Sequence, residues 1–568
     1  MNKEKIVIYQ VLPRLFGNTQ SQNTIGGNRE ENGTGKLSAF SPRVLKEFKR
    51  MGITHVWYTG LLEHATQTDY SAYGIGKDHP AIVKGKAGSP YAIKDYYDID
   101  PDLADHVPAR MEEFEALVGR THREGLKVII DFVPNHVARE YHSDVKPPDA
   151  TDLGANDNIH TTFDSNNNFY YIPGQAFQPE FPLDGEGDAF YEFPAKATGN
   201  DCFSARPGRN DWYETVKLNY GIDYLNGRSR HFHPVPDTWT KMRDILLFWA
   251  SKDIDGFRCD MAEMVPVEFW AWVIPEIKKE YSRIIFIAEV YEPNQYRKYL
   301  HTGKFDYLYD KVGMYDTLRN VICGRQPASD ITRCWQSVDD ILPHILYFLE
   351  NHDEQRVASD FFAKDPTKAI PALGIIACMN VNPILIYAGQ ELGEKGMDAE
   401  GFSGRDGRTS IFDYWSVKSL REWFNEGKVN TELLDKNQKE LREFYIRILQ
   451  STQTSDAIKN GLFYDLMYVN PRSESFNPDT QYAFLRKTGN ELLLIVANFA
   501  DHDVDVTVFI PAHAFEYLQL DSQRITGAKD LLASDSQLAE EAFKGGNDRY
   551  PLRIGKNNLR ILMFSLKK

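Results

Sequence analysis

Short apolar runs alternate with helical periods along most of the chain. From Lys5 to about residue 395, each unit has a short β-branched or aromatic run, a turn, and a segment with apolar residues at helical spacing. Eight of these runs have the length of buried strands: Ile6–Val11, His55–Thr59, Lys127–Val133, Asp255–Cys259, Ile284–Ala288, Phe305–Tyr309, Ile345–Leu349 and Ile384–Tyr387. Eight strands that mostly alternate with helices favour a closed (β/α)8 TIM barrel over an open doubly wound sheet, so the expected fold class is α/β.

A long segment separates the third expected strand from the helical period near Thr238–Ser251. It holds roughly a hundred residues rich in Asn, Asp, Gly, Pro and Tyr, and a plain loop of that length is uncommon in a compact domain. A disordered insertion is the alternative, but the segment contains many aromatic residues: Phe169, Tyr170, Tyr171, Tyr191 and Tyr213. These favour a small folded subdomain over the mouth of the barrel.

The pattern changes after about Thr452, where strands follow one another without crossover helices. The expected strands here are Gln481–Arg486, Glu491–Asn498, Asp505–Ile510 and Leu559–Leu566. They predict a C-terminal antiparallel β-sandwich domain. The predicted organisation is a catalytic barrel from residues 1–136 and 220–450, an inserted subdomain at 137–219, and the β-sandwich at 451–568.

Composition and charge exclude several kinds of partner. Hydrophobic residues make up 42% of the 568 residues and charged residues 26%, which is typical of a globular protein with more than one domain. The net charge is −16, and a field of this sign repels phosphate groups and anionic lipid. Neither nucleic acid nor a membrane is therefore expected as a partner, and the oligomeric state is left open.

Two features favour a cytoplasmic location. The chain reaches a strand-like run by Ile6, which leaves no room for the apolar region of a signal peptide, and no run of roughly eighteen apolar residues follows. The cysteines are odd in number and contain no C-x-x-C pair: Cys202, Cys259, Cys323, Cys334 and Cys378.

Polar residues follow several of the expected barrel strands, at the end where active sites of such barrels lie. The third strand ends in D-F-V-P-N-H, Asp131–His136, and the fourth in D-G-F-R-C-D, Asp255–Asp260. The fifth ends in F-I-A-E with Glu289, and the seventh in F-L-E-N-H-D with Asp353. We therefore expect Asp260, Glu289 and Asp353 to converge on one cavity.

Converging carboxylates indicate glycosidic chemistry. Cleavage of a glycosidic bond needs one carboxylic acid to protonate the departing oxygen and one carboxylate to attack or support the oxocarbenium-like centre. A metal site is the alternative use, and a single strand-end Asp is often only a helix cap. Arg258 and His352, which neighbour the carboxylates in sequence, suit sugar hydroxyls and carboxylate orientation better than an oxygen cage.

In order and spacing, these four segments resemble the signature regions of the α-amylase family, glycoside hydrolase family 13. The resemblance extends over nearly the whole chain, through IYQVLPRLF, SPYAIKDYYDIDP, NPILIYAGQELG and the C-terminal AFLRKTGNELLLIVANF. It implies Asp260 as the nucleophile that forms a covalent glycosyl-enzyme, with Arg258 orienting it and keeping it ionised. It implies Glu289 as the general acid and base, and Asp353 as the carboxylate that binds the 2- and 3-hydroxyls of the sugar.

Further binding residues are implied by the same resemblance. His136 and His352 match neutral hydrogen-bond partners of the sugar ring, and Tyr91 matches the aromatic ring on which the sugar stacks. A carboxylate beside Arg is expected to have a lowered pKa, whereas an acid at pH 7 needs a pKa raised by burial or by nearby negative charge.

The chain departs from the family pattern where many relatives bind calcium. In those relatives, Asn135 would join an Asp of the inserted subdomain around Ca²⁺, but the matching segment Val216–Asn219 carries Lys217 at the place of that Asp. An ammonium group cannot ligate Ca²⁺ and can occupy its place electrostatically. We therefore expect neither the interdomain calcium nor any organic cofactor.

Two more segments bear on specificity. Met261–Met264 lacks the Lys-His pair that follows the nucleophile in typical endo-acting amylases, which weakens the case for endo-cleavage of long starch. Gly404–Trp415, GRDGRTSIFDYW, resembles a segment that lines the leaving-group side in relatives that act on short oligosaccharides; a plain surface loop is an equal alternative.

The expected function is hydrolysis of α-1,4-glucosidic bonds in starch-derived glucans or maltodextrins, with retention at the anomeric carbon. Transglycosylation on the same residues is the nearest rival, followed by α-1,6 or α-glucosidase specificity. A non-catalytic carbohydrate-binding protein on the same fold is a rival of another class. Its hallmark would be the loss of a carboxylate, and all three carboxylates are present.

Overall fold

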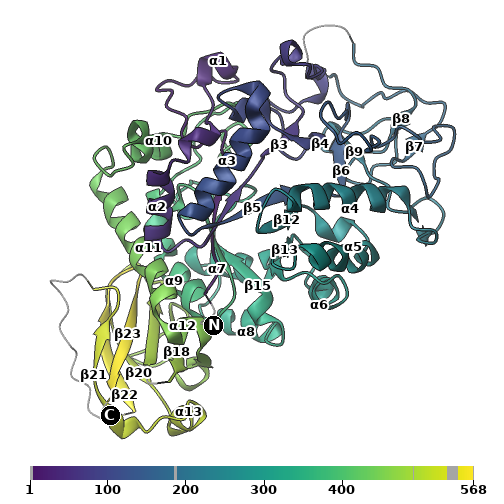
Figure 1. Cartoon of the computed structure of the whole chain (residues 1–568). Coiled ribbons are helices and arrows are strands. Elements are labelled where there is room, and N and C mark those ends of the chain that lie inside the picture. The colour runs from purple at the N-terminus through teal and green to yellow at the C-terminus, as the bar shows by residue number, and fades with distance from the viewer. Residues whose placement is uncertain (1–3, 184–188, 490, 534–547, 567–568) are drawn as a thin grey trace.

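Eight parallel strands close into a barrel in the computed structural model, which describes residues 4–183, 189–489, 491–533 and 548–566 (Figure 1). The strands are β1 (Val7–Val11), β2 (His55–Tyr58), β5 (Lys127–Phe132), β12 (Gly256–Cys259), β13 (Ile285–Ala288), β14 (Tyr307–Tyr309), β15 (Ile345–Phe348) and β16 (Ile384–Tyr387). The ring closes where β1 pairs with both β2 and β16, with Ile8 beside His55 and Val7 beside Ile384. The predicted (β/α)8 barrel is confirmed, and each of the eight expected strands is present.

The barrel strands are buried on both faces. Ile8 points into the barrel, where it packs with Ile129 and Leu346, whereas its neighbours Val7 and Tyr9 pack outward under the helices. A strand covered on both sides needs a near-continuous apolar run, which is why these strands could be recognised in the sequence. The covering helices are α2 (Pro42–Met51), α3 (Arg110–Arg123), α4 (Asp237–Ala250), α5 (Val267–Glu280), α6 (Tyr296–His301), α7 (Asp316–Ile322), α8 (Asp330–Ser337), α9 (Ile370–Cys378), α10 (Lys418–Phe424) and α11 (Lys436–Thr454).

Helix α2 shows how local chemistry sets these helices. The Ser41 hydroxyl accepts a hydrogen bond from the backbone N–H of Val44, Pro42 occupies the first turn, and Gly52 ends the helix in the left-handed conformation at φ 96°. The buried residues Val44, Leu45, Phe48 and Met51 recur at helical spacing and form the face that packs on the barrel.

The segment between β5 and α4 is folded. Three short antiparallel pairs organise it: β6 (His136–Ala138) with β9 (Thr215–Lys217), β7 (Tyr171–Ile172) with β8 (Ala195–Lys196), and β10 (Ile222–Asp223) with β11 (Ser229–Arg230). Phe169, Tyr170 and Tyr171 are buried, but Tyr191 is 75% exposed, so not every aromatic residue of the insertion belongs to its core. The insertion extends to the right of the barrel in Figure 1, together with the hairpin of β3 (Leu62–His64) and β4 (Ile93–Ile99).

The C-terminal part is an antiparallel β-domain. Its larger sheet has the order β17 (Leu462–Asp465), β18 (Gln481–Thr488), β19 (Glu491–Asn498), β23 (Asn558–Leu566) and β21 (Ile525–Asp530), and a second sheet pairs β20 (Val504–Phe509) with β22 (Arg549–Ile554). The four expected strands are present. Strands β17, β21 and β22 were not predicted. A register shift between Ile525 and Gly527 interrupts β21, and Pro551 interrupts the pattern of β22.

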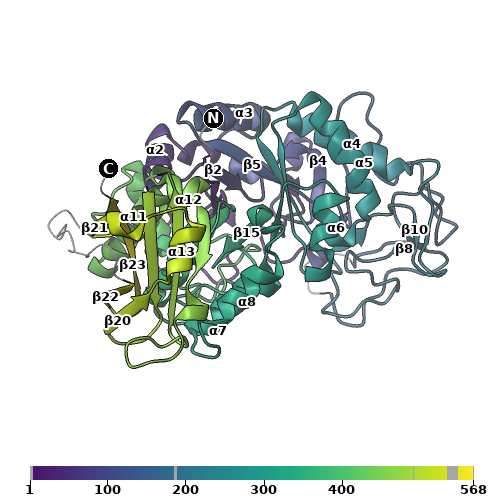
Figure 2. The ribbon, with the colours of Figure 1, turned by 90° about the horizontal axis from the view of Figure 1, so that it is seen from below.

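This domain lies against the amino-terminal side of the barrel, on the opposite side of the molecule from the insertion (Figures 1 and 2). Helix α9 approaches β23 so closely that a Cβ at Gly374 would come 1.9 Å from a methyl carbon of Leu559 and would force that side chain to shift. Among the residues that the structure describes, no helix combines the length and apolar character that a bilayer span requires. The residue boundaries between the three parts stay predictions.

A buried arginine joins the barrel to the C-terminal domain. Arg486 on β18 donates to the carbonyl groups of Ala457 at 2.9 Å, Ile458 at 3.1 Å and Gly461 at 2.8 Å, and also to that of Met379 at the end of α9. Arg486 thus caps the carboxyl ends of α9 and of α12 (Asp456–Asn460), where unpaired carbonyl groups carry partial negative charge. Burial lowers the pKa of Arg486 to about 10.

Replacing this cap tests the junction. Arg486→Met keeps an apolar stem but leaves four buried carbonyl groups without their donor, which should lower the free energy of unfolding by about 2–4 kcal/mol. Calorimetry should show a clear drop in Tm, whereas Arg553→Met, at an exposed position of β22, should stay within about 0.5 kcal/mol of wild type. Equal melting of the two variants would contradict the role given to Arg486.

Candidate active site

Asp260 and Glu289 lie side by side at the carboxyl ends of adjacent strands. Strands β12 and β13 pair in parallel with Cys259 opposite Ala288, so the next residue of each strand reaches the same rim of the barrel. Arg258 lies on β12, two residues before Asp260, and bridges the two carboxylates. Its Nη1 is 2.7 Å from Oδ1 of Asp260, and its Nη2 is 2.7 Å from Oε2 of Glu289.

Aromatic rings enclose the guanidinium of Arg258. Its central carbon lies 5.2 Å from the centroid of Trp57, 5.4 Å from that of Tyr91 and 5.6 Å from that of Tyr309, and Nε donates to the Tyr309 hydroxyl at 3.3 Å. The side chain is fully buried. Cation–π contacts and the carboxylates therefore fix the guanidinium in one position.

Asp131 adds a third carboxylate around the same cation. Its Oδ1 lies 3.6 Å from Nη1 of Arg258, and its Oδ2 accepts hydrogen bonds from Nε1 of Trp57 at 3.1 Å and from the backbone N–H of Gly60 at 3.3 Å. Sequence analysis treated Asp131 only as the start of a motif. Its position near the end of a strand could have indicated a role in the site, but only the fold shows that Asp131 reaches Arg258.

Negative charge outnumbers positive charge in this cluster. Burial raises the pKa of Asp260 well above its ordinary value; the guanidinium of Arg258 opposes that rise, and Glu289 adds to it. The expectation that Arg258 lowers the pKa of Asp260 overall is therefore wrong. Burial also raises the pKa of Asp131 to about 6 and, together with Glu289, that of Asp353 to about 7. A cluster with this excess of carboxylates retains protons near neutral pH.

Glu289 is held at both oxygens. Oε2 accepts a hydrogen bond from the backbone N–H of Met261 at 2.8 Å and forms the ion pair with Arg258, and Oε1 accepts from the Tyr291 hydroxyl at 2.8 Å. Met261 adopts φ 43°, an unusual conformation for a residue with a side chain, which turns its N–H toward Glu289. Sequence analysis did not single out Tyr291 or this backbone donor.

Asp353 follows β15 and neighbours His352. Nε2 of His352 lies 3.2 Å from Oδ2 of Asp353 and 2.6 Å from the Tyr91 hydroxyl, while Nδ1 lies 2.7 Å from Nε2 of Gln10. Because Gln10 can only donate through Nε2, Nδ1 is assigned as the acceptor and Nε2 as the protonated nitrogen. Burial and Arg258 hold the pKa of His352 well below its ordinary value, so the ring is a neutral donor.

Tyr91 and His136 belong to the surrounding shell. The Tyr91 ring stacks on His352 with 5.2 Å between the centroids. His136 instead hydrogen-bonds with the backbone of Tyr91 and packs edge-on against Trp212 at 5.3 Å. Burial lowers the pKa of His136 to about 3, so this ring is also neutral.

Lys217, which stands where the sequence resemblance would place a calcium ligand, lies between Asn135 and the insertion. Its Nζ lies 2.7 Å from Oδ1 of Asp201 and 3.5 Å from the carbonyl of Met264, and it donates to Oδ1 of Asn135. The side chain is buried, and burial lowers its pKa against the opposing effect of Asp201. Both oxygens that could ligate Ca²⁺ thus face an ammonium group already, and this set of residues does not fit the metal.

The segment Gly404–Trp415 packs beside Asp353. Nε of Arg408 donates to the carbonyl of Asp353 at 2.6 Å, and the backbone N–H of Arg356 donates to the carbonyl of Gly407 at 2.7 Å. The segment is therefore anchored to the loop after β15, next to the cluster. That it lines the leaving-group side stays a prediction.

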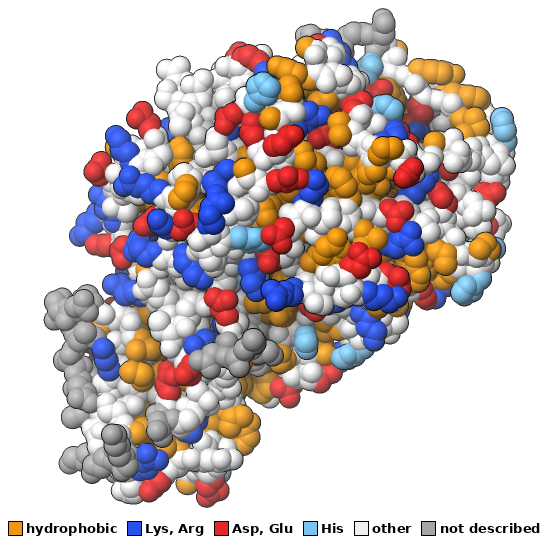
Figure 3. Space-filling model, in the orientation of Figure 1, with side chains coloured by type: hydrophobic (Ala, Val, Ile, Leu, Met, Phe, Trp, Pro, Cys, Tyr) orange, Lys and Arg blue, Asp and Glu red, His pale blue; other side chains and the backbone are white. Residues whose placement is uncertain are grey.

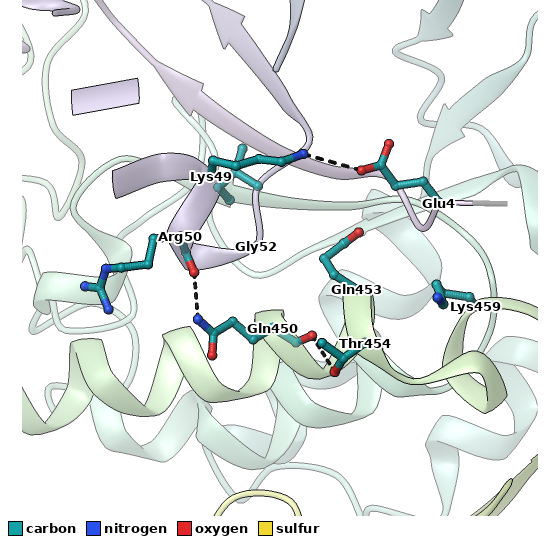
Figure 4. Close-up of a pocket in the computed structure, with 9 residues that line it drawn as sticks. Glu4, Lys49, Arg50, Gly52, Gln450, Gln453, Thr454 and Lys459 are labelled. Atoms are coloured by element: carbon teal, nitrogen blue, oxygen red, sulfur yellow. Dashed lines mark hydrogen bonds and ion pairs between the residues drawn. The ribbon is translucent and has the colours of Figure 1, made fainter. Parts of the chain in front are cut away.

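A separate cavity of about 880 Å³ opens at the opposite end of the barrel (Figure 4). It is lined by Glu4, Lys49, Arg50, Gly52, Ile53, Gln450, Gln453, Thr454 and Lys459. Its groups satisfy one another: Nζ of Lys49 lies 3.6 Å from Glu4, and Gln450 donates to the Arg50 carbonyl at 2.8 Å. The amino-terminal face of such barrels serves stability, and the carboxylate cluster at the other end is the better candidate for chemistry.

Acidic, basic and apolar side chains are interspersed over the face seen in Figure 3, without one extended charged region.

Known proteins resemble this chain in sequence and fold. Residues 10–443 match the family model described as Alpha amylase, catalytic domain. Alpha-amylase 2 of Dictyoglomus thermophilum is 21% identical over 510 residues, which cover 88% of this chain and 70% of that protein. The alpha-1,4-glucan:maltose-1-phosphate maltosyltransferase of Cereibacter sphaeroides is 35% identical over 226 residues, only 39% of this chain and 24% of that protein.

Among solved structures, the maltogenic alpha-amylase AmyB from Thermotoga neapolitana superposes with a TM-score of 0.62 at 20% identity, and the match covers 100% of both chains. At this identity the likeness concerns the fold alone.

The raised pKa of Asp353 predicts a pH-dependent stability. The folded protein keeps this proton up to about pH 7, whereas the ordinary value is 3.8, so this group makes stability fall as pH rises between those values. Asp353→Asn removes that loss, and its Tm relative to wild type should rise by roughly 1–2 °C between pH 5 and pH 8. Although protein surrounds much of the side chain, 41% of it is exposed, and solvent screening keeps the effect small. Asp360→Asn, at an exposed position, is the matched control; a difference from wild type that is the same at every pH would contradict the prediction.

Proposed function

The chain belongs to the α-amylase family of glycoside hydrolases, and on that premise we propose that it hydrolyses α-1,4-glucosidic bonds of starch-derived glucans or maltodextrins with retention at the anomeric carbon. The observation that carries the proposal is the bridge from Arg258 to Asp260 and Glu289, with 2.7 Å to each carboxylate. Two carboxyl groups held by one guanidinium are close together, as a double-displacement mechanism requires. An inverting enzyme needs a wider gap that admits a water molecule between them.

Asp260 would attack the anomeric carbon while Glu289 protonates the departing glycosidic oxygen. The bond from the anomeric carbon to that oxygen breaks, and a covalent bond to Asp260 forms. Glu289, now deprotonated, would take a proton from water as the water attacks and releases Asp260. The Arg258 guanidinium supports the first step, because it opposes protonation of Asp260, the attacking carboxylate.

Asp353, His352 and Tyr91 would hold the sugar ring beside these groups. Neutral His352 can donate through Nε2 to a sugar hydroxyl next to Asp353, and the Tyr91 ring offers an apolar face for stacking. His136 supports Tyr91 through its backbone and extends the same wall. Hydrogen bonds from sugar hydroxyls to Asp353 that strengthen as the ring flattens would favour the transition state over the bound substrate.

Product chromatography tests the proposal. Wild type should convert maltoheptaose and starch to short maltodextrins, and Asp260→Asn should lose activity by on the order of 10³–10⁴-fold because no covalent intermediate can form. Asp360→Asn should retain wild-type products. Inactivity of wild type on every α-glucan would overturn the proposal.

The same chromatograms separate the rival activities. Oligosaccharides longer than maltoheptaose would indicate transfer of glucosyl units to a sugar acceptor. Similarity to a maltosyltransferase is the reason to test for this activity. Cleavage of pullulan or isomaltose would indicate action on α-1,6 bonds. A non-catalytic glucan-binding protein would leave every substrate intact and still bind it.

We propose further that Lys217 takes over the role of the interdomain calcium. Its ammonium joins Asn135 at the end of β5 to Asp201 of the insertion, so the contact that a metal would mediate is made within the chain. Melting should be the same in chelator and in added Ca²⁺. Lys217→Met should lower the free energy of unfolding by about 1–3 kcal/mol, because Asp201 and Asn135 lose their buried partner. The exposed Lys77→Met is the control, and a Tm that falls in chelator and recovers with Ca²⁺ would refute this role.

A further inference from the structure

Four rings gather on the outer surface of the C-terminal domain, away from the carboxylate cluster. We define the aromatic patch as Tyr464, Tyr468, His513 and Tyr517. Centroid distances are 6.2 Å from Tyr464 to Tyr468, 6.2 Å from Tyr464 to His513, 5.6 Å from Tyr464 to Tyr517 and 6.0 Å from Tyr468 to His513. The patch lies at α13 (Ala512–Tyr517), at the lower end of the domain in Figure 1, whereas the catalytic ends of the barrel strands face the insertion.

The fold places these rings on one surface for identifiable reasons. Along β17, Phe463 and Asp465 turn toward α8, where they contact Trp335, so Tyr464 between them points to the other face. Along α13 (Ala512–Tyr517), His513 and Tyr517 are four residues apart and share the exposed face. Tyr468 reaches them from the short turn after β17.

The patch contributes little to the core of the domain. Tyr468 is 61% exposed and Tyr517 is 53% exposed, while Phe515 and Ala514 of α13 supply the buried contacts. The rings nevertheless keep a fixed arrangement, because the Tyr464 and Tyr468 hydroxyls hydrogen-bond each other and the Tyr468 hydroxyl bonds Nε2 of His513. Exposed, ordered rings of this kind mark a binding surface and lose little conformational freedom when a ligand is bound.

We propose that the aromatic patch is a second carbohydrate-binding site, which takes an α-glucan chain outside the active site. This rests on the proposed function, since it assumes the same class of polymer. Tilted ring faces match the apolar faces of successive sugar units, and the hydroxyl and imidazole groups at their edges can exchange hydrogen bonds with sugar hydroxyls.

A second copy of the chain fits the patch less well. A buried aromatic ring hides about 150–250 Å², so four half-exposed rings offer about 400 Å². A stable protein interface needs roughly 800 Å² on each partner. A single sugar chain makes use of the smaller area.

Glucan binding at the aromatic patch would affect only long substrates. A polymer held at the aromatic patch stays near the enzyme and raises the local concentration of cleavable ends, whereas a short oligosaccharide cannot occupy both places. Loss of the patch should therefore weaken binding and turnover of polymers and leave short substrates unaffected.

Affinity electrophoresis with and without amylopectin in the gel is the test, carried out in the inactive Asp260→Asn background. Addition of Tyr468→Ala and Tyr517→Ala should reduce retardation by amylopectin at least threefold, while Leu433→Ala, at another exposed apolar position, should not. In the active protein, the double variant should lose several-fold in kcat/KM on amylopectin and none on maltotriose. A Tm equal to that of the parent protein excludes a folding defect.

The outcomes separate this inference from the proposed function. If the double variant is retarded by amylopectin as strongly as its parent, glucan binding at the aromatic patch is overturned. Hydrolysis of maltotriose would then still support the proposed function. Retardation that depends on the patch, in a protein that hydrolyses no glucan, would support the binding site and overturn the hydrolytic function. A shift of sedimentation from dimer to monomer in the double variant would assign the patch to self-association and overturn the inference.

Discussion

One buried guanidinium, that of Arg258, organises the carboxylate cluster. Asp260 and Glu289 lie on neighbouring strands and would repel each other, but each is 2.7 Å from the same cation. The aromatic rings around Arg258 exclude water and hold the cation in place, so removing it would leave several buried charges without a partner. The chemistry proposed for the site depends on this arrangement, because Arg258 holds the two carboxylates close together and opposes protonation of Asp260.

Tethered cations also join the parts of the chain. Lys217 links the insertion to the barrel through Asn135 and Asp201, and Arg486 links the C-terminal domain through carbonyl groups at helix ends. Lys5 adds to the second joint by donating to the carbonyl of Asn380 at 2.5 Å, and burial beside Arg486 lowers its pKa to about 7. A cation on a side chain brings no binding equilibrium with it, so each joint is complete as soon as the chain folds.

The regular elements could be predicted because their physical requirements are local. Barrel strands covered on both sides need unbroken apolar runs, and Ile345–Leu349 or Ile384–Tyr387 show them plainly. Strand β22 could not be recognised, because Pro551 breaks the pattern at an edge where the backbone needs no partner. Tyr191 was counted among the aromatic residues that predicted a folded insertion, but its side chain is exposed, and an aromatic residue alone does not indicate a core.

The sequence by itself determined the barrel and the set of residues at its strand ends, because the alternation of strands and helices and the ends of strands depend on a few consecutive residues. From Lys217 the sequence also led us to predict that the interdomain calcium is absent, although it did not indicate that Asp201 is the partner of this lysine. Only the tertiary structure decided that Asp131 shares Arg258, that Met261 turns its N–H to Glu289, and that burial outweighs Arg258 in the pKa of Asp260. Those features depend on distances between residues far apart in the chain and on the solvent excluded around them, and neither quantity exists before the barrel closes.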